Sequence, residues 1–234
     1  MKQLAKSLVV ISALAAAGSA GADMMGDFNP YVGADYYQAW MRGKSSYNQI
    51  FPKSYPGATI YIGNKFTENF GLELGYDWSA KAKKSWTLPV GTQVFNSTVA
   101  TSAITGTTKI QRTGFHLDLV GFLPINDCVN LLGSIGYGWV QPKIEITSLT
   151  PSANGGNNNY TAISSLSGKG RSVFRVAVGA DWMATDMFGL RAKLGWESTS
   201  TLRINGNQQF TNLGYQQKGF KGSTTLAIGA FVKF

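Results

Sequence analysis

The chain has 234 residues, with 21 Lys and Arg against 12 Asp and Glu, a formal net charge of +9 at pH 7 and a single cysteine. Charged residues make up only 14% of it, whereas Gly occurs 28 times and aromatic residues reach 12%. This composition disfavours a water-soluble β-sandwich, which exposes more charge, and one cysteine excludes an internal disulfide. The length favours a single domain.

The first 22 residues predict a secretory signal peptide. Lys2 and Lys6 supply positive charge, residues 8–17 are apolar, and residues 20–22 (Ala-Gly-Ala) form a small-residue cleavage site. We therefore expect export, with residues 23–234 as the mature domain. That domain contains no run approaching the roughly 18 uninterrupted apolar residues of a transmembrane helix.

Eight segments of the mature domain alternate apolar and polar residues, as strands with one apolar face do. In chain order they are residues 30–41, 57–65, 70–79, 113–123, 129–141, 172–183, 188–198 and 222–234. Three short connections alternate with four long ones rich in Ser, Thr, Asn and Gly, among them residues 80–112 and 142–171. Because only a closed barrel leaves no strand edge unpaired in lipid, the pattern predicts an all-β, eight-stranded antiparallel up-and-down transmembrane barrel of the bacterial outer membrane.

Successive residues of each strand point alternately to lipid and to the lumen. In the third strand, for example, Leu72, Leu74 and Trp78 have the lipid parity. Glycines recur at the lumenal parity and leave room for larger side chains there. Tryptophans of the lipid parity predict an aromatic girdle at each membrane interface. These are Trp40, Trp78, Trp139 and Trp196 at the outer interface and Trp182 at the inner one.

Charged residues of the lumenal parity predict a salt-bridge network, because charges enclosed in a barrel need partners. The network comprises Glu73, Asp181, Arg191, Lys193, His116, Asp118 and Arg175, with Asp35, Asp77, Glu197 and Lys233 on the same parity. We expect Glu73 and Arg191 to form its central pair. The first interpretation is a polar filling that holds the barrel together, and the alternative is a narrow gated ion path.

Basic residues are concentrated in the long connections, where Glu145 is the only acid. Lipopolysaccharide phosphates lie at that height in the outer leaflet and attract cations. The predicted contacts are Arg42, Lys44, Lys81, Lys83, Lys84, Arg112, Arg171 and Lys221. Recognition of anionic host or matrix polymers is the alternative, and the compartment argues against nucleic acid.

The sequence shows no metal-ligand spacing, phosphate-binding glycine loop or nucleophile elbow, so we predict no cofactor, metal ion or catalytic residue. His116 with Asp118 is the one pair that could serve a hydrolase. Both residues have the lumenal parity, away from lipid and from the outer rim. We therefore expect that the protein is not an enzyme.

Residues 70–78 (Phe-Gly-Leu-Glu-Leu-Gly-Tyr-Asp-Trp) resemble the third strand of the OmpA-type transmembrane domain, and residues 31–34 resemble its first strand. Asp181 and Arg191 also keep that family's spacing of an acid and an arginine. The resemblance implies a monomeric barrel of the OmpA/Opa superfamily without the peptidoglycan-binding domain. It also implies a lumenal salt-bridge gate formed by Glu73, Asp181 and Arg191. The family's lumenal Lys on the fourth strand is absent here.

We therefore expect an outer membrane protein with a structural and surface-interaction role, which maintains membrane integrity, contacts lipopolysaccharide and forms at most a narrow gated pore. A surface adhesin that acts through its long extracellular loops and a small-solute channel are the alternatives. Expected partners are outer membrane lipid and lipopolysaccharide, the barrel-assembly machinery through the C-terminal Phe234, and a host surface ligand.

Overall fold

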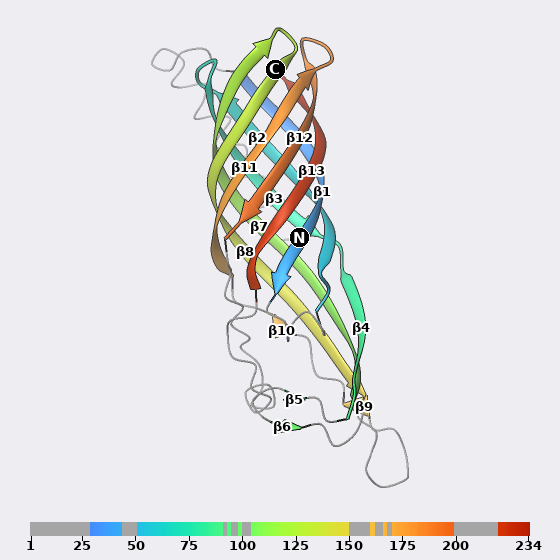
Figure 1. Ribbon diagram of the computed structural model, residues 1–234. Helices are drawn as coiled ribbons and strands as arrows, with labels where there is room; N and C mark the ends of the chain where they lie inside the picture. The colour runs from blue at the N-terminus through green and yellow to red at the C-terminus, as the bar shows by residue number, and fades with distance from the viewer. Residues whose placement is uncertain are drawn as a thin grey trace, which may run out of the picture.

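Eight antiparallel strands close into a barrel in a computed structural model of the chain (Figure 1). The structure describes residues 29–43, 51–90, 93–94, 98–99, 104–149, 160–161, 166–167, 170–198 and 220–234. The barrel strands are β1 (Asn29–Gly43), β2 (Ser54–Lys65), β3 (Phe70–Ser79), β7 (Ile104–Asn126), β8 (Val129–Leu149), β11 (Arg171–Met183), β12 (Phe188–Glu197) and β13 (Phe220–Lys233). The predicted fold class is confirmed, while the predicted signal peptide lies outside the described residues.

Each barrel strand pairs with the barrel strands before and after it in the chain, and the ring closes between β1 and β13. At this closure Tyr31 lies opposite Lys233, and the paired register continues to Met41 opposite Ser223. The barrel ring itself therefore has no free edge, as lipid requires. No helix long and apolar enough to cross a membrane occurs in the described part of the chain.

Two strands run beyond the ends that the sequence predicts. Residues 80–112 and 142–171 are expected as loops, but the pairing of β7 with β8 continues outward from the barrel as far as Thr105 opposite Leu149. A further strand, β4 (Ala82–Leu88), pairs with β7. The part of β7 and β8 beyond the barrel forms, together with β4, a sheet that we call the extension (Figure 1). Its Thr and Ile residues favour strands, although their mixture with Ser, Lys and Gly is also typical of loops.

Four short strands complete the described chain. Two of them, β9 (Tyr160–Thr161) and β10 (Leu166–Ser167), pair with the extended part of β8. The other two, β5 (Gln93–Val94) and β6 (Thr98–Val99), pair with each other in a separate hairpin.

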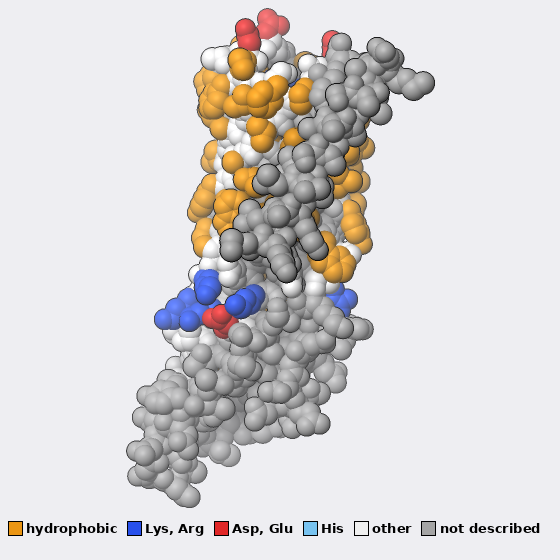
Figure 2. All heavy atoms as spheres, turned by 180° about the vertical axis from the view of Figure 1, so that it is seen from behind, with side chains coloured by type: hydrophobic (Ala, Val, Ile, Leu, Met, Phe, Trp, Pro, Cys, Tyr) orange, Lys and Arg blue, Asp and Glu red, His pale blue; other side chains and the backbone are white. Residues whose placement is uncertain are grey.

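All eight barrel strands expose large apolar side chains on the outside of the barrel, which form an apolar band, and Figure 2 shows them on one face. Val178 is 62% exposed and Ile228 63%, which is unfavourable in water but suits contact with acyl chains. The five tryptophans predicted for the girdles all lie on this surface, with exposed fractions between 39% for Trp196 and 54% for Trp139. Trp196 and Trp40 both lie opposite Thr224, one on each side of β13, and therefore at a similar height.

Lumen-facing glycines lie directly opposite large side chains of the neighbouring strand. Gly33 is paired with Tyr61 and Gly63 with Tyr31, and each tyrosine ring lies where the Cβ of a larger residue would be. The same arrangement occurs at Gly57 with Tyr37, Gly75 with His116, Gly136 with Asp118, Gly189 with Phe231 and Gly229 with Asp35. Each glycine therefore makes room for one specific neighbour, and a shift in register would produce a clash.

An apolar cluster fills the lumen near the short turns, and we call it the aromatic plug. It consists of Tyr31, Tyr61, Val120, Phe122, Leu132 and Phe231, each 4% exposed or less. The ring of Tyr31 meets those of Tyr61 and Phe231 edge-on, with centroids 6.4 and 6.1 Å apart. Such edge-to-face packing is favourable and leaves little space between the rings.

We predict that Ile228→Arg destabilises the barrel by about 2–4 kcal/mol, because Ile228 faces lipid near the middle of the bilayer. On β13 it lies midway between Thr224, which is opposite Trp196, and Val232, which is opposite Phe188. Urea unfolding of the protein in lipid vesicles measures the change. Ile228→Ala is the control for the lost apolar area, and a charged variant as stable as this control would contradict the lipid-facing assignment.

We also predict that Gly63→Ala destabilises the protein by about 1–3 kcal/mol, because the new Cβ must displace the buried Tyr31 ring. Gly133→Ala is the matched control, since an added Cβ there meets no atom within 4 Å. This exposed change should shift the free energy of unfolding by less than about 0.5 kcal/mol. The same vesicle assay compares the two, and equal effects would refute the paired-glycine explanation.

Candidate functional site

Arg191 on β12 is the centre of the lumenal charges. Its Nε and Nη2 donate to the two carboxylate oxygens of Asp181 at 2.7 and 2.9 Å, and its Nη1 donates to Glu73. The hydroxyl of Tyr31 donates to the same oxygen of Glu73 at 2.8 Å. All four residues are only 2% exposed. Burial of one guanidinium with two carboxylates is favourable only with such direct hydrogen bonds.

Aromatic rings of the plug surround the same guanidinium. Its central carbon lies 5.6 Å from the ring centroid of Tyr31, 5.0 Å from that of Tyr61 and 5.2 Å from that of Phe231. These distances are within the range of cation–π attraction, which is stronger where water is excluded. Arg191 is therefore both the hub of an ion-pair cluster and a packing partner of the aromatic plug.

Lys193, two residues further along β12, provides a second cation near Glu73. Its Nζ lies 2.9 Å from Oδ2 of Asp35 and 4.0 Å from Oε2 of Glu73. OmpA-type barrels have a lumenal Lys on the fourth strand, where this chain has His116 and Asp118. Here the second cation projects from the seventh barrel strand instead.

A second ion-pair cluster lies nearer the extracellular end of the lumen. Arg175 on β11 contacts Asp77 at 2.8 Å and Glu197 at 3.5 Å. The ring of His116 lies between two acids, with Nδ1 3.2 Å from Asp77 and Nε2 3.7 Å from Asp118. These residues line a polar lumenal cavity. The cluster thus joins strands β3, β7, β11 and β12 across the barrel.

The position of Arg112 differs from the sequence-based expectation. The sequence places it among the outward-facing cations, but its Nη2 is 2.5 Å from Oε2 of Glu197 and its Nη1 donates to the Tyr55 hydroxyl at 2.8 Å. Only 13% of its side chain is exposed. The cause is the length of β7: because the strand already includes residue 112, Arg112 has the lumenal parity of His116 and Asp118.

The other cations predicted for lipopolysaccharide contact lie at the extracellular end as far as the structure describes them. Arg42, Lys81 and Lys83 are exposed, and Lys84 and Arg171 are half-buried. Lys44 and the side chain of Lys221 lie outside the described residues. On the face that Figure 2 shows, basic side chains with an acidic one among them lie beyond one border of the apolar surface, and acidic side chains lie beyond the other. The exposed acids at the short turns are Glu68, Asp127 and Asp186.

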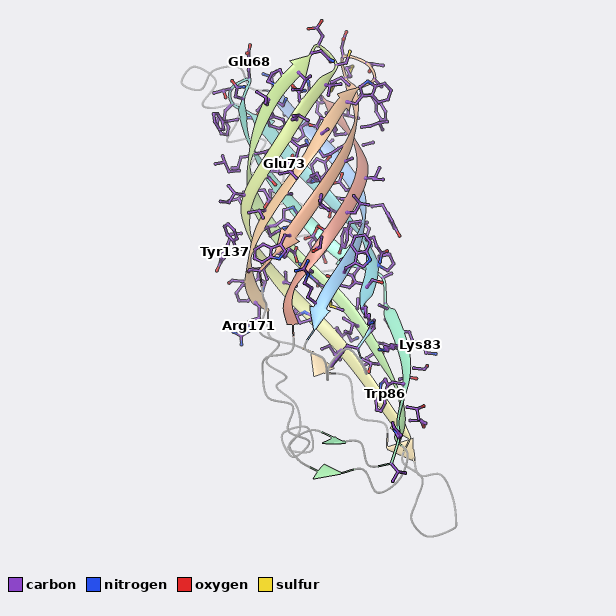
Figure 3. The ribbon with its side chains drawn as sticks, viewed as in Figure 1. Glu68, Glu73, Lys83, Trp86, Tyr137 and Arg171 are labelled. Atoms are coloured by element: carbon purple, nitrogen blue, oxygen red, sulfur yellow. The ribbon has the colours of Figure 1, made fainter. Side chains whose placement is uncertain are left out.

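Two of these cations directly follow girdle tryptophans. Arg42 comes two residues after Trp40, and Lys81 comes three residues after Trp78. Figure 3 shows Glu68 at the short-turn end, Glu73 within the barrel, and Lys83 and Arg171 at the opposite end. Along the barrel axis the order is therefore acids, apolar band, tryptophans and cations.

The geometry of the described lumenal residues provides ion pairing. His116 is 3% exposed, and both of its ring nitrogens face carboxylates. Among the described residues, no group of three or more His, Cys, Asp or Glu side chains could hold a metal ion.

Comparison with solved structures finds several outer membrane proteins that align with this chain. The outer membrane protein OprG from Pseudomonas aeruginosa aligns with a TM-score of 0.53 and 10% identity, over 90% of this chain and 97% of that one. A major outer membrane protein from Thermus thermophilus aligns with a TM-score of 0.54 and 12% identity, over 87% and 99%. Neisserial surface protein A aligns with a TM-score of 0.48 and 13% identity, over 88% and 97%. Identities this low show likeness of fold alone.

A comparison with curated proteins finds no match. The family model described as "Outer membrane protein beta-barrel domain" matches residues 7–234, almost the whole chain. The predicted location in the bacterial outer membrane and the resemblance to outer membrane β-barrels are confirmed. The chain belongs to the outer membrane protein beta-barrel domain family.

Proposed function

We propose that this protein is a structural and surface-interaction component of the outer membrane, without enzymatic activity, whose lumen is closed and whose outer cations contact lipopolysaccharide phosphates. The observation that carries the proposal is the order of side chains along the axis. Basic side chains lie beyond the apolar surface (Figure 2), and Arg42 and Lys81 follow Trp40 and Trp78 by two and three residues. This order matches the order of acyl chains, interface and phosphates in an outer leaflet.

The packing of the lumen supports a closed barrel over a small-solute channel. Tyr31, Tyr61 and Phe231 are each 3% exposed or less, although they point into the lumen. A continuous water path would leave such side chains accessible. Eight-stranded barrels are narrow enough for side chains to fill them, and here the plug and the Arg191 cluster together provide that filling.

The outer cations are well placed for phosphate contact. Arg42 is two residues after Trp40 on β1, and Lys81 is two residues after the end of β3 and three after Trp78. An extended chain advances about 3.3 Å per residue and is tilted in a barrel, so both cations lie roughly 5–8 Å beyond these tryptophans. An anionic membrane surface attracts each nearby Lys or Arg by about 1 kcal/mol, and this attraction falls off within a Debye length of about 8 Å at physiological salt. Several such contacts anchor the barrel at a defined depth.

A second candidate function is surface recognition of the adhesin type. The extension supports it, because the extension is a paired sheet outside the lipid band that presents lysines to solvent. Lys109 and Lys143 are 45% and 51% exposed and share one acid, Glu145, at 4.0 and 3.7 Å. This leaves an excess of positive charge on that face for an anionic host ligand.

The C-terminal Phe234 supports a third contact, with the barrel-assembly machinery, during insertion. Its side chain is 73% exposed, while its backbone N–H donates to the carbonyl of Pro30 at 3.0 Å. The terminal residue is thus fixed at the β1–β13 closure with its ring available on the surface. We propose that the barrel is monomeric once this closure has formed.

We predict that Arg191→Ala destabilises the protein by about 3–5 kcal/mol, because it leaves Asp181 and Glu73 buried without their main partner. Lys193→Ala is the control, since Lys193 is more exposed and only its contact with Asp35 is close. Urea unfolding in lipid vesicles compares the two, and equal losses of stability would contradict the central role of Arg191.

Current recording tests whether the lumen is closed. Wild-type protein in a planar lipid bilayer should show no discrete current steps. Reproducible steps that Arg191→Ala alters in size would refute the closed lumen and favour the gated ion path.

We predict that Arg42→Gln with Lys81→Gln removes about 2 kcal/mol of stabilisation by lipopolysaccharide, about 1 kcal/mol for each cation. The measurement is urea unfolding in phosphatidylcholine vesicles with and without lipopolysaccharide. The wild-type gain should shrink when salt rises from about 0.15 M to about 1 M, where the Debye length is about 3 Å. Glu68→Gln with Asp186→Asn, at the opposite rim, is the matched control. An equal gain in the cation variant and the wild type would argue against the proposed contact.

A further inference from the structure

The last strand of the extension, β4, has one paired edge and one edge that pairs with no other strand in the described part of the chain. β4 pairs with β7 along its whole length, from Ala82 opposite Ile110 to Leu88 opposite Ile104. Across the extension, the far edge of β8 is covered by β9 and β10. Within the described residues no strand pairs with the second edge of β4, which runs along the outside of the molecule (Figure 1). Such an edge presents a row of backbone N–H and C=O groups.

Side-chain packing holds this edge in its extended form. The indole of Trp86 lies across Gly106 on β7, at the position that a Cβ would occupy. Its Nε1 donates to the Thr108 hydroxyl at 2.9 Å, and Ser85 and Thr107 are within 3.4 Å of each other through their hydroxyls. An edge already ordered by its own sheet loses little conformational freedom when it binds another strand.

The edge carries positive charge on both of its faces. Lys83 and Lys84 point to opposite sides of β4, as successive strand residues do. Lys83 is exposed and lies directly opposite Lys109. Burial and the neighbouring ammonium of Lys53 lower the pKa of Lys84. Lys81 adds a further exposed cation where the chain enters β4.

This charge distribution selects the kind of strand that could pair there. If a second copy of the chain paired here through its own β4, lysines of the two copies would lie close together. Like charges directly opposite each other are destabilising. A strand with acidic residues on both faces would instead neutralise Lys83 on one side and Lys84 with Lys53 on the other. Edge lysines thus discourage self-association while favouring an acidic partner.

We propose that the second edge of β4, which no described strand covers, binds an extended acidic polypeptide segment of another protein by adding it to the extension as a further strand. The backbone groups of residues 82–88 provide the hydrogen bonds, and the lysines of both faces select for carboxylates. This recognition goes beyond lipopolysaccharide contact, and it uses the extension rather than the membrane rim.

The test uses the full-length protein in phosphatidylcholine nanodiscs and two synthetic peptides. The first repeats Glu-Glu-Thr-Thr over about eight residues, which is enough to span β4 and places Glu on both faces of the strand, and the second has the same sequence with every backbone nitrogen methylated. Methylation keeps the charge but removes the hydrogen-bond donors of both edges of the peptide. We expect the first peptide to bind and the methylated one to bind at least about tenfold more weakly, which corresponds to about 1.4 kcal/mol.

Variants separate the edge from general charge attraction. Lys83→Gln with Lys84→Gln should weaken binding of the first peptide, whereas Lys143→Gln, on β8 of the same sheet, should leave it unchanged. Heat-modifiable gel migration confirms that each variant retains its barrel. Equal binding of the two peptides would show charge attraction only and overturn the proposal, as would absence of binding by the first peptide or an equal loss in Lys143→Gln. None of these outcomes depends on lipopolysaccharide.

Discussion

Lipid offers no hydrogen bonds to a polypeptide backbone, and the rest of this structure depends on that constraint. Each strand must be paired on both sides, so the eight strands form a ring that closes between β1 and β13. Closure divides every strand into a lipid parity and a lumenal parity. The charged residues of the lumenal parity are then enclosed and have to find one another, which is why Arg191, Glu73 and Asp181 meet from three different strands.

The lumen is filled by matching large side chains to glycines. Tyr31 and Tyr61 each lie across a glycine on the neighbouring strand. Both rings also contact the guanidinium of Arg191, so the aromatic plug packs directly against the ion-pair cluster. His116 and Asp118 extend the same arrangement into the polar half, since each of them also faces a glycine. A single strand register thus both avoids steric clashes and allows the ion pairs to form. Such agreement between packing and electrostatics is typical of sequences that specify a single fold.

Sequence alone predicts the barrel and its two parities because lipid on one side makes the two-residue period strong. The same reasoning fails beyond the membrane, where both faces of β7 contact water or protein and residues 104–112 resemble a polar loop. The prediction that Arg112 faces outward is wrong for that reason, although its parity already points inward. The sequence also does not predict which charged residues pair with each other. Lys193 contacts Asp35 because the two strands have a particular stagger, and alternation along a strand gives no information about that stagger.

A lumen filled with ion pairs is not the arrangement of greatest stability, since apolar residues of similar volume often do as well or better. Its advantage here is specificity. A strand displaced by one residue turns its lumenal side chains to the lipid and its lipid-facing side chains to the lumen. If both sets were apolar, this displacement would cost little free energy. With Arg191, Glu73 and Asp181 on one parity, the same displacement would place charges in acyl chains, at about 2–4 kcal/mol for an Arg at the midplane. We infer that the buried charges disfavour misregistered barrels. The extension lies outside the lipid, so this constraint does not apply to its lysines.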